Sequence, residues 1–140
     1  MTKENRRRAN VYTVKFHSKR HREAFASALQ MAGRSDQYLA SALYLLTADA
    51  NVWKTMKFRV KNGEINFEQV KFITINEKGY ILYTAAKDLY LGTEHLCIAD
   101  LADEEMIRSR AYELICCGML LRRGEEQIPK EMILPKEENR

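Results

Sequence analysis

The sequence predicts an all-α protein, a compact bundle of five to six helices around one buried central helix. Residues 38–46 (YLASALYLL) contain no charge, and a helix without a polar face is usually a buried one. In other segments apolar residues recur at spacings of three and four, which is typical of amphipathic helices. Ser, Asp or Asn precedes these segments and Gly follows several of them, as at helix ends.

Size and composition indicate one globular domain. The chain has 140 residues, of which 46% are hydrophobic and 30% charged, enough for a substantial core. No run approaches the roughly 18 apolar residues of a membrane span. The basic N-terminus has no apolar stretch behind it, so it is not a secretory signal. Three cysteines, Cys97, Cys116 and Cys117, do not form a disulfide framework, which predicts a reducing cytoplasm.

Three regions are expected along the chain: a basic flexible arm at 1–9, a single helical domain at 10–123, and a flexible charged tail at 124–140. Residues 10–16 (NVYTVKF) have some strand character but no evident partner strand, so they predict an extended lead-in packed on helices. Within the tail, KEMIL (130–134) is a short apolar island. It is either a docking motif or a segment that is inert or packed back on the domain.

The first predicted helix begins after Ser18 and ends at Gly33. Its expected buried stripe consists of His21, Ala24, Phe25, Ala28, Leu29 and Ala32. Ser35 or Asp36 then caps the central helix, which runs to about Leu46. Asp49 caps a short helix that carries Val52, Trp53 and Met56.

The middle of the chain is less regular. Asn62-Gly63 is a strong turn signal. Asn66 predicts the cap of another short helix, with Phe67 and Val70 facing inward. The stretch FITI (72–75) is either a strand, from its β-branched residues, or a connector, from its brevity.

Two longer helices complete the prediction. Asn76 caps a helix to Leu91, and Gly92 ends it. Asp103 caps the last helix, with acidic residues in its first turn where the helix dipole favours them, and Gly118 ends or weakens it. The expected core residues of this helix are Ile107, Ala111, Leu114 and Ile115.

Charge is divided unevenly between the two halves of the chain. Residues 1–61 hold 13 Lys and Arg against 4 Asp and Glu, whereas residues 62–140 hold 10 against 15. The basic half suggests an acidic partner such as nucleic acid. The simpler interpretation is that the halves attract each other or are solvated surfaces. The candidate nucleic-acid-binding residues are Arg6, Arg7, Arg8, Lys15, Lys19, Arg20, Arg22, Lys54, Lys57, Arg59 and Lys61.

Catalytic and metal-binding patterns are weak. His17 with His21, and His95 with Cys97, do not match the ligand spacing of a zinc module, and Cys116 with Cys117 diverge by about 100° on a helix. These two cysteines are expected to be buried, inert thiols. No nucleophile elbow, phosphate-binding loop or dinucleotide fingerprint is present. The sequence therefore predicts a protein that is not an enzyme and has no metal or cofactor.

The segments FHSKRHREAF, DQYLASALYLLTADANVW, GEINFEQV and LADEEMIRSRAYELICCGM together resemble a family of short bacterial proteins of unknown function. Such proteins are often encoded on mobile elements or prophages. The resemblance covers about residues 16–124, and ALYLLTAD with Trp53 is its most specific part. It implies a compact helical domain and an accessory protein that acts on host machinery, for example an anti-CRISPR-like inhibitor of bacterial immunity.

We therefore expect a non-enzymatic binding protein, a small cytoplasmic regulator or inhibitor that occludes a host protein or nucleoprotein, without contact to a membrane. The acidic residues that would mimic nucleic acid are Glu94, Asp100, Asp103, Glu104 and Glu105. The alternative is a nucleic-acid-binding accessory protein that uses the basic N-terminal half.

Overall fold

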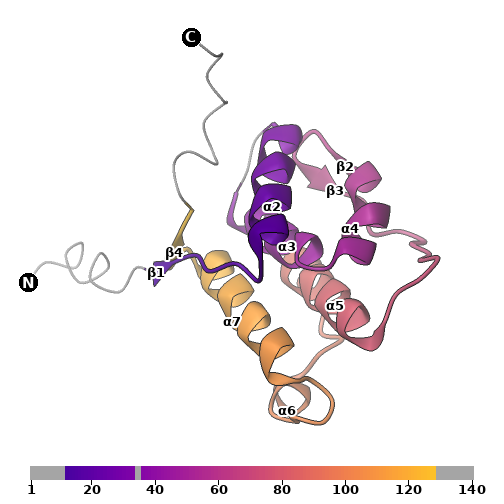
Figure 1. Cartoon of the computed structure of the whole chain (residues 1–140), viewed down its shortest axis with the longest axis vertical. Coiled ribbons are helices and arrows are strands. Elements are labelled where there is room, and N and C mark those ends of the chain that lie inside the picture. The colour runs from indigo at the N-terminus through magenta and orange to yellow at the C-terminus, as the bar shows by residue number, and fades with distance from the viewer. Residues whose placement is uncertain (1–11, 34–35, 129–140) are drawn as a thin grey trace, which may run out of the picture.

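The computed structural model describes residues 12–33 and 36–128, and the all-α prediction is confirmed (Figure 1). The helices of this part are α2 (Lys19–Ala32), α3 (Gln37–Thr47), α4 (Ala50–Met56), the 3₁₀-helix η1 (Lys57–Arg59), α5 (Glu77–Leu91), α6 (Ile98–Leu101) and α7 (Ser109–Arg123). Two small sheets accompany them, formed by β1 (Tyr12–Thr13) with β4 (Glu126–Gln127) and by β2 (Val60–Lys61) with β3 (Glu64–Ile65).

Helix α3 is the centre of the fold, as the stretch YLASALYLL predicts. Every residue from Leu39 to Thr47 is buried, and α3 packs against α2, α5 and α7. The hydroxyls of Ser41 and Thr47 are satisfied inside this apolar surrounding, because they donate to the carbonyls of Tyr38 and Leu43 at 3.0 and 2.7 Å. Full burial of one Leu side chain stabilises a fold by about 1.5–3 kcal/mol, so the four leucines of α3 supply much of the core.

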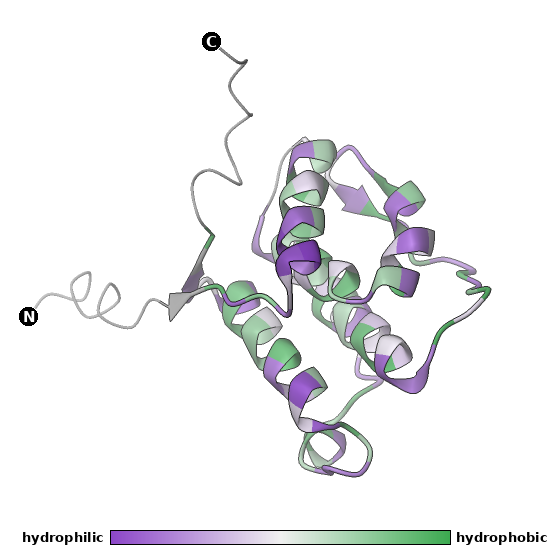
Figure 2. Ribbon diagram, viewed as in Figure 1, coloured by the Kyte–Doolittle hydropathy of each residue, from purple (hydrophilic) through white to green (hydrophobic). Residues whose placement is uncertain are grey.

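Helices α2, α3, α4 and α5 begin at the predicted caps, and α2 and α5 end at the predicted glycines. Side-chain oxygens of Ser18, Asp36, Asp49 and Asn76 accept backbone N–H groups in the first turns of α2, α3, α4 and α5. Glycines with positive φ follow α2 and α5, where only a residue without a Cβ adopts that conformation easily. These outer helices alternate purple and green in Figure 2, the pattern of helices with one exposed and one buried side.

The N-terminal lead-in has a partner strand, contrary to the prediction. β1 pairs in parallel with β4, Tyr12 opposite Glu126 and Thr13 opposite Gln127, although more than 100 residues separate them. The tail was expected to begin at residue 124, but the folded domain continues through this pair to Ile128, which packs against the core. Sequence alternation reveals no partner here, because each strand has only two residues. The arm at 1–9 and the KEMIL segment lie outside the described residues.

Asn66 does not cap a helix. The sequence Asn62-Gly63 makes the turn of the β2–β3 hairpin, with φ of 54° and 76°, and the chain then stays irregular to α5. The side chain of Asn66 closes a short turn by accepting the N–H of Glu68 at 2.8 Å. The guanidinium of Arg59 donates to the carbonyl of Glu68 at 2.7 Å. This carbonyl oxygen therefore accepts from a side chain and not from a backbone N–H of a helix. FITI (72–75) is a connector.

Gly118 does not end α7, which continues to Arg123 and ends at Gly124. Gly118 is buried against α3, and a Cβ at this position would lie 3.0 Å from Cδ1 of Leu45. The glycine therefore allows α3 and α7 to approach closely. Within the described residues, no helix combines the length and the apolar character that crossing a membrane requires.

Candidate functional site

The predicted acidic residues lie in one excursion of the chain between α5 and α7, residues 93–107, which we name the acidic loop. It contains five Asp or Glu residues and no Lys or Arg. Glu94, Asp103, Glu104 and Glu105 are exposed, and Asp100 is half-buried. Figure 1 shows the loop, with α6 inside it, at the lower end of the molecule beyond the start of α7.

The sequence predicts that the last helix begins at Asp103, and this prediction is wrong. Asp103 caps only one turn, because its Oδ1 accepts the N–H of Glu105 at 3.0 Å and the chain then leaves helical geometry. Ile107 is buried and ties this point to the core, Arg108 is extended, and α7 starts at Ser109. Glu104 and Glu105 therefore belong to an exposed turn and not to the first turn of a helix.

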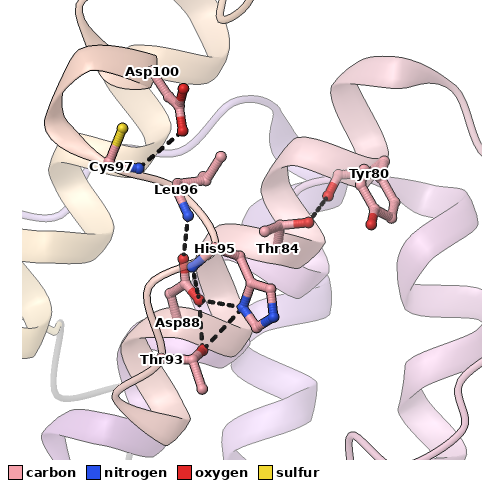
Figure 3. A network of polar contacts seen from close by, with 8 residues as sticks. All are labelled: Tyr80, Thr84, Asp88, Thr93, His95, Leu96, Cys97 and Asp100. Carbon is pink, nitrogen blue, oxygen red and sulfur yellow. Dashed lines mark hydrogen bonds and ion pairs between the residues drawn. The ribbon is translucent and has the colours of Figure 1, made fainter.

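Asp88, near the end of α5, fixes the start of the acidic loop (Figure 3). Its carboxylate accepts the hydroxyl of Thr93, the backbone N–H groups of His95 and Leu96 at 3.0 and 2.8 Å, and the ring Nδ1 of His95 at 2.8 Å. Burial alone would raise the pKa of Asp88, but these hydrogen bonds outweigh it and hold the pKa below its usual value. The loop is thus held in one conformation by an ionised carboxylate.

Asp100 also holds the backbone of the acidic loop, because its carboxylate accepts the N–H of Cys97 at 2.9 Å, at the start of α6. The thiol of Cys97 points away from the imidazole of His95 in Figure 3, so these two residues do not form the metal pair considered from the sequence. Between them and the acidic turn, Ile98 is 85% exposed. An apolar side chain is therefore exposed on a negatively charged loop whose backbone is held by hydrogen bonds.

The predicted basic residues separate into several groups. Lys54, Lys57, Arg59 and Lys61, together with the exposed ring of Phe58, form what we name the basic ridge, along α4, η1 and β2. The ring of Phe58 is 74% exposed, and the Nζ of Lys57 lies 5.2 Å from its centroid.

A groove of about 370 Å³ between α2 and the α4–η1 segment is lined by Arg20, Trp53 and Lys57, so one cation from each of the two predicted basic clusters lies there. A larger hollow of about 1070 Å³ on the other side of the ridge is lined by Phe58, Lys61 and Lys87 among others.

Several of the predicted cations already have structural partners. Arg59 donates to three loop carbonyls, and Arg20 donates to the carbonyl of Thr47 at 2.6 Å. The guanidinium of Arg22 lies 5.8 Å from the ring of Phe16. Lys19 is exposed, with Glu23 at 4.0 Å. Lys15 lies apart from the ridge, at the cleft described next, and Arg6, Arg7 and Arg8 lie outside the described residues.

Sequence reasoning missed a cleft of about 410 Å³ between residues 15–17 and α7, which we name the α7 cleft. Its lining includes Phe16 and His17 on one side, Arg110 and Tyr112 on α7, and Tyr44 with Cys117. Cys116 and Cys117 are half-buried and line this cleft, so they are not the buried thiols that were expected. No sequence signal marks the cleft, because its residues come from distant parts of the chain.

A buried polar group of residues lies behind the cleft. Tyr44 donates its hydroxyl to the carbonyl of Lys15, and burial raises its pKa. His21 accepts the N–H of His17 at Nδ1, and its Nε2 therefore donates to the carbonyl of Tyr44 at 2.7 Å. Burial lowers the pKa of His21 to about 4, so this imidazole is neutral at pH 7.

Glu126 on β4 completes this group. Burial raises its pKa to about 7, although Cys117 and Lys15 act in the other direction. Its Oε2 is buried and has no hydrogen-bond partner among the described residues. Burial likewise raises the pKa of the Cys117 thiol, which is unfavourable for a nucleophile. In residues 12–33 and 36–128, no three His, Cys, Asp or Glu side chains are arranged to hold a metal ion.

Comparisons of the chain with protein-family models, with curated proteins and with solved structures found no match. The resemblance to short bacterial proteins stays a prediction.

Proposed function

We propose that this protein is a non-enzymatic binding protein that docks its acidic loop on a basic surface of a protein partner. The observation that carries the proposal is the side chain of Ile98, 85% exposed within a loop of five acidic residues and no basic ones. A single exposed apolar residue is common on protein surfaces, so it is the position of Ile98 among acidic residues that favours an interaction site. The occupant we favour is the nucleic-acid-binding face of a protein, because such a face has the complementary charge.

The rigidity of the loop supports this function. Asp88 and Asp100 hold its backbone before any partner arrives, so little conformational entropy is lost on docking. The charge is also local. Residues 12–33 and 36–128 together contain 15 Lys and Arg against 15 Asp and Glu, so the described part is neutral and the loop is a distinct acidic pole. The mechanism would be occlusion, with the loop occupying the place of nucleic acid.

The biological setting is part of the same proposal. The resemblance noted in the sequence suggests a regulator or inhibitor encoded by a mobile element, with an anti-CRISPR-like role as one example, acting in the bacterial cytoplasm. The three free cysteines are compatible with that compartment.

The test is capture of partners from a bacterial lysate treated with nuclease, using the wild type and two matched triple variants. The loop variant carries Asp103→Asn, Glu104→Gln and Glu105→Gln. The control carries Glu23→Gln, Glu64→Gln and Glu68→Gln, which removes three exposed charges elsewhere. We expect one nucleic-acid-binding protein to be retained by the wild type and the control, lost with the loop variant, and displaced by added nucleic acid. A captured protein that binds all three equally, or that nucleic acid does not displace, contradicts the proposal.

The basic ridge favours a second candidate function, binding of single-stranded nucleic acid. Its specific observation is the exposed ring of Phe58 beside Lys57, since aromatic stacking and phosphate contacts act together in such proteins. Fluorescence anisotropy with labelled single-stranded RNA and DNA tests it across a salt series. Lys54→Gln with Lys57→Gln and Lys61→Gln should weaken binding at least about tenfold and reduce the salt dependence. Binding that changes neither with salt nor with these substitutions would exclude the basic ridge as the nucleic-acid-binding site.

A further inference from the structure

The α7 cleft contains a hydrogen-bond donor that lacks an acceptor. The Nζ of Lys78 lies 3.4 Å from Nε2 of His17, and an ammonium group can only donate, so Nε2 must accept. In the neutral ring the proton is then on Nδ1. That atom is buried, and it has no hydrogen-bond partner among the described residues. A buried N–H without an acceptor is costly, and such groups are rare unless a ligand or water completes them.

Positive charge gathers around the same ring from several elements. Burial, and then the charges of Lys78, Arg110 and Arg20, hold the pKa of His17 below its usual value. Asp49 acts in the opposite direction, but its carboxylate already accepts the N–H groups at the start of α4. His17 therefore remains a neutral hydrogen-bond donor surrounded by positively charged side chains. Such a position favours the binding of an anion.

Within the described residues, no ion pair involves the cations at the cleft. The ion pairs found in the described part of the chain are Lys19 with Glu23, His95 with Asp88, and Arg123 with Glu125. None of them involves Lys15, Lys78 or Arg110. Glu113 lines the cleft and Glu126 lies beside Cys117 and Lys15, so these two acidic residues would oppose an anion.

Two aromatic rings add an apolar component to the cleft. Phe16 is held by edge-on contact with His21 at 5.2 Å and by Tyr44 at 5.9 Å, so its position is fixed. Tyr112, from the first turns of α7, is 43% exposed and available to a ligand. The volume of about 410 Å³ lies within the usual range of small-molecule sites, about 300–1,000 Å³.

We propose that the α7 cleft binds a small anion that carries an aromatic ring, such as a nucleoside monophosphate, with its anionic group at His17 and its ring against Phe16 and Tyr112. The anionic oxygen accepts from Nδ1 of His17 and is neutralised by Lys78 and Arg110. This site is distinct from the basic ridge and adjoins the acidic loop only at Tyr112, which also lines a hollow with Glu104 and Ile107. It extends the proposed function and does not depend on it.

Isothermal titration calorimetry and ¹H–¹⁵N NMR with two probes test the site. Adenosine 5′-monophosphate carries a ring and a phosphate, and 8-anilinonaphthalene-1-sulfonate carries a ring and a sulfonate. We expect saturable binding of at least one probe, with shifted amide signals at 15–17 and 110–117. Adenosine and inorganic phosphate, each with half of the chemistry, should bind more weakly by at least about tenfold.

The variants separate this site from general attraction of anions. Lys78→Gln and Arg110→Gln should each weaken binding about tenfold or more, and Tyr112→Ala severalfold, with unchanged circular dichroism. Arg108→Gln is the matched control, because this exposed arginine lies two residues from Arg110 but does not line the cleft. Equal loss in Arg108→Gln and Arg110→Gln overturns the proposal. So does the absence of saturable binding by both probes, or adenosine binding as tightly as its monophosphate. None of these results affects the test of the acidic loop.

Discussion

Helices α3 and α7 meet in two adjacent places that differ completely in character. At Leu45 and Gly118 the contact is apolar and so close that an added Cβ would lie 3.0 Å from Cδ1 of Leu45. One residue earlier on each helix, Tyr44 and Cys117 border a cleft that contains buried polar groups. Consecutive side chains on a helix point in directions about 100° apart. Neighbouring residues of the same two helices can therefore face the closed core and the polar cleft. The first contact determines stability, and the second makes the protein sensitive to pH.

Gly118→Val should have the largest effect, because it fills the close contact. The added side chain must displace the fully buried side chain of Leu45, and overpacking of this kind costs roughly 2–3 kcal/mol. Urea unfolding followed by circular dichroism measures the loss. In a Leu45→Ala background the same substitution should cost much less, because the smaller residue leaves room. Equal costs in both backgrounds would mean that Gly118 does not serve this contact.

His21 should make the polar side sensitive to acid. Its pKa is about 4 in the folded protein, against an ordinary value of 6.5, so the unfolded chain binds more protons between these values. Its contribution is complete above pH 6.5 and is lost as pH falls toward 4, by roughly 2 kcal/mol. Proton NMR of the ring should give a midpoint near 4. The variant His21→Gln should be less stable at pH 7 and lose less stability between pH 6.5 and 4. A midpoint near 6.5 contradicts the burial argument.

Glu126 should act in the opposite direction. Its pKa is raised to about 7 from an ordinary value of 4.5, so the folded protein binds more protons between these values. Stability from this residue is greatest below pH 4.5 and falls as pH rises through 7, by roughly 1–2 kcal/mol. Glu126→Gln, which stays neutral, should therefore raise the melting temperature at pH 8 by several degrees and have little effect at pH 5. Destabilisation by Glu126→Gln at pH 8 would show that the carboxylate has a stabilising partner.

Ile98→Ser should have the smallest effect on the fold. Ile98 is 85% exposed, so its replacement should change the free energy of unfolding by less than about 0.5 kcal/mol. If the acidic loop docks as proposed, the same substitution should abolish capture of the partner. A large loss of stability would indicate that Ile98 packs within this chain and is not displayed for a partner.

The sequence anticipated the parts of the fold that depend on local pattern. Ser18, Asp36, Asp49 and Asn76 are caps that each act within three residues, and the stretch without charge at 38–46 has only the core to enter. Asn66 and Asp103 carry the same signal but cap only short turns. Their side chains satisfy nearby N–H groups in either conformation, and the contacts of Arg59 and Ile107 decide against a helix.

Parts of the candidate sites were visible in the sequence. Five acidic residues were identified from the segment 94–105, but the exposure of Ile98 and the fastening by Asp88 depend on how the loop folds. The basic residues were identified as a group, although the structure assigns Lys15 to another surface and engages Arg59 internally. Composition counts charges without showing which carbonyls or rings they already contact.

The sequence by itself determined the helical class, the central helix and most helix ends, because periodicity and capping act over a few residues. Tertiary structure alone decided the β1–β4 pair, the contact of Gly118 with Leu45 and the α7 cleft. In the cleft, His17, Lys78 and Arg110 come from separate elements, and Glu126 lies on a strand near the other end of the chain. The burial of Nδ1 of His17 and Oε2 of Glu126 arises only when those elements pack together, since desolvation is a property of the assembled surroundings and not of any segment.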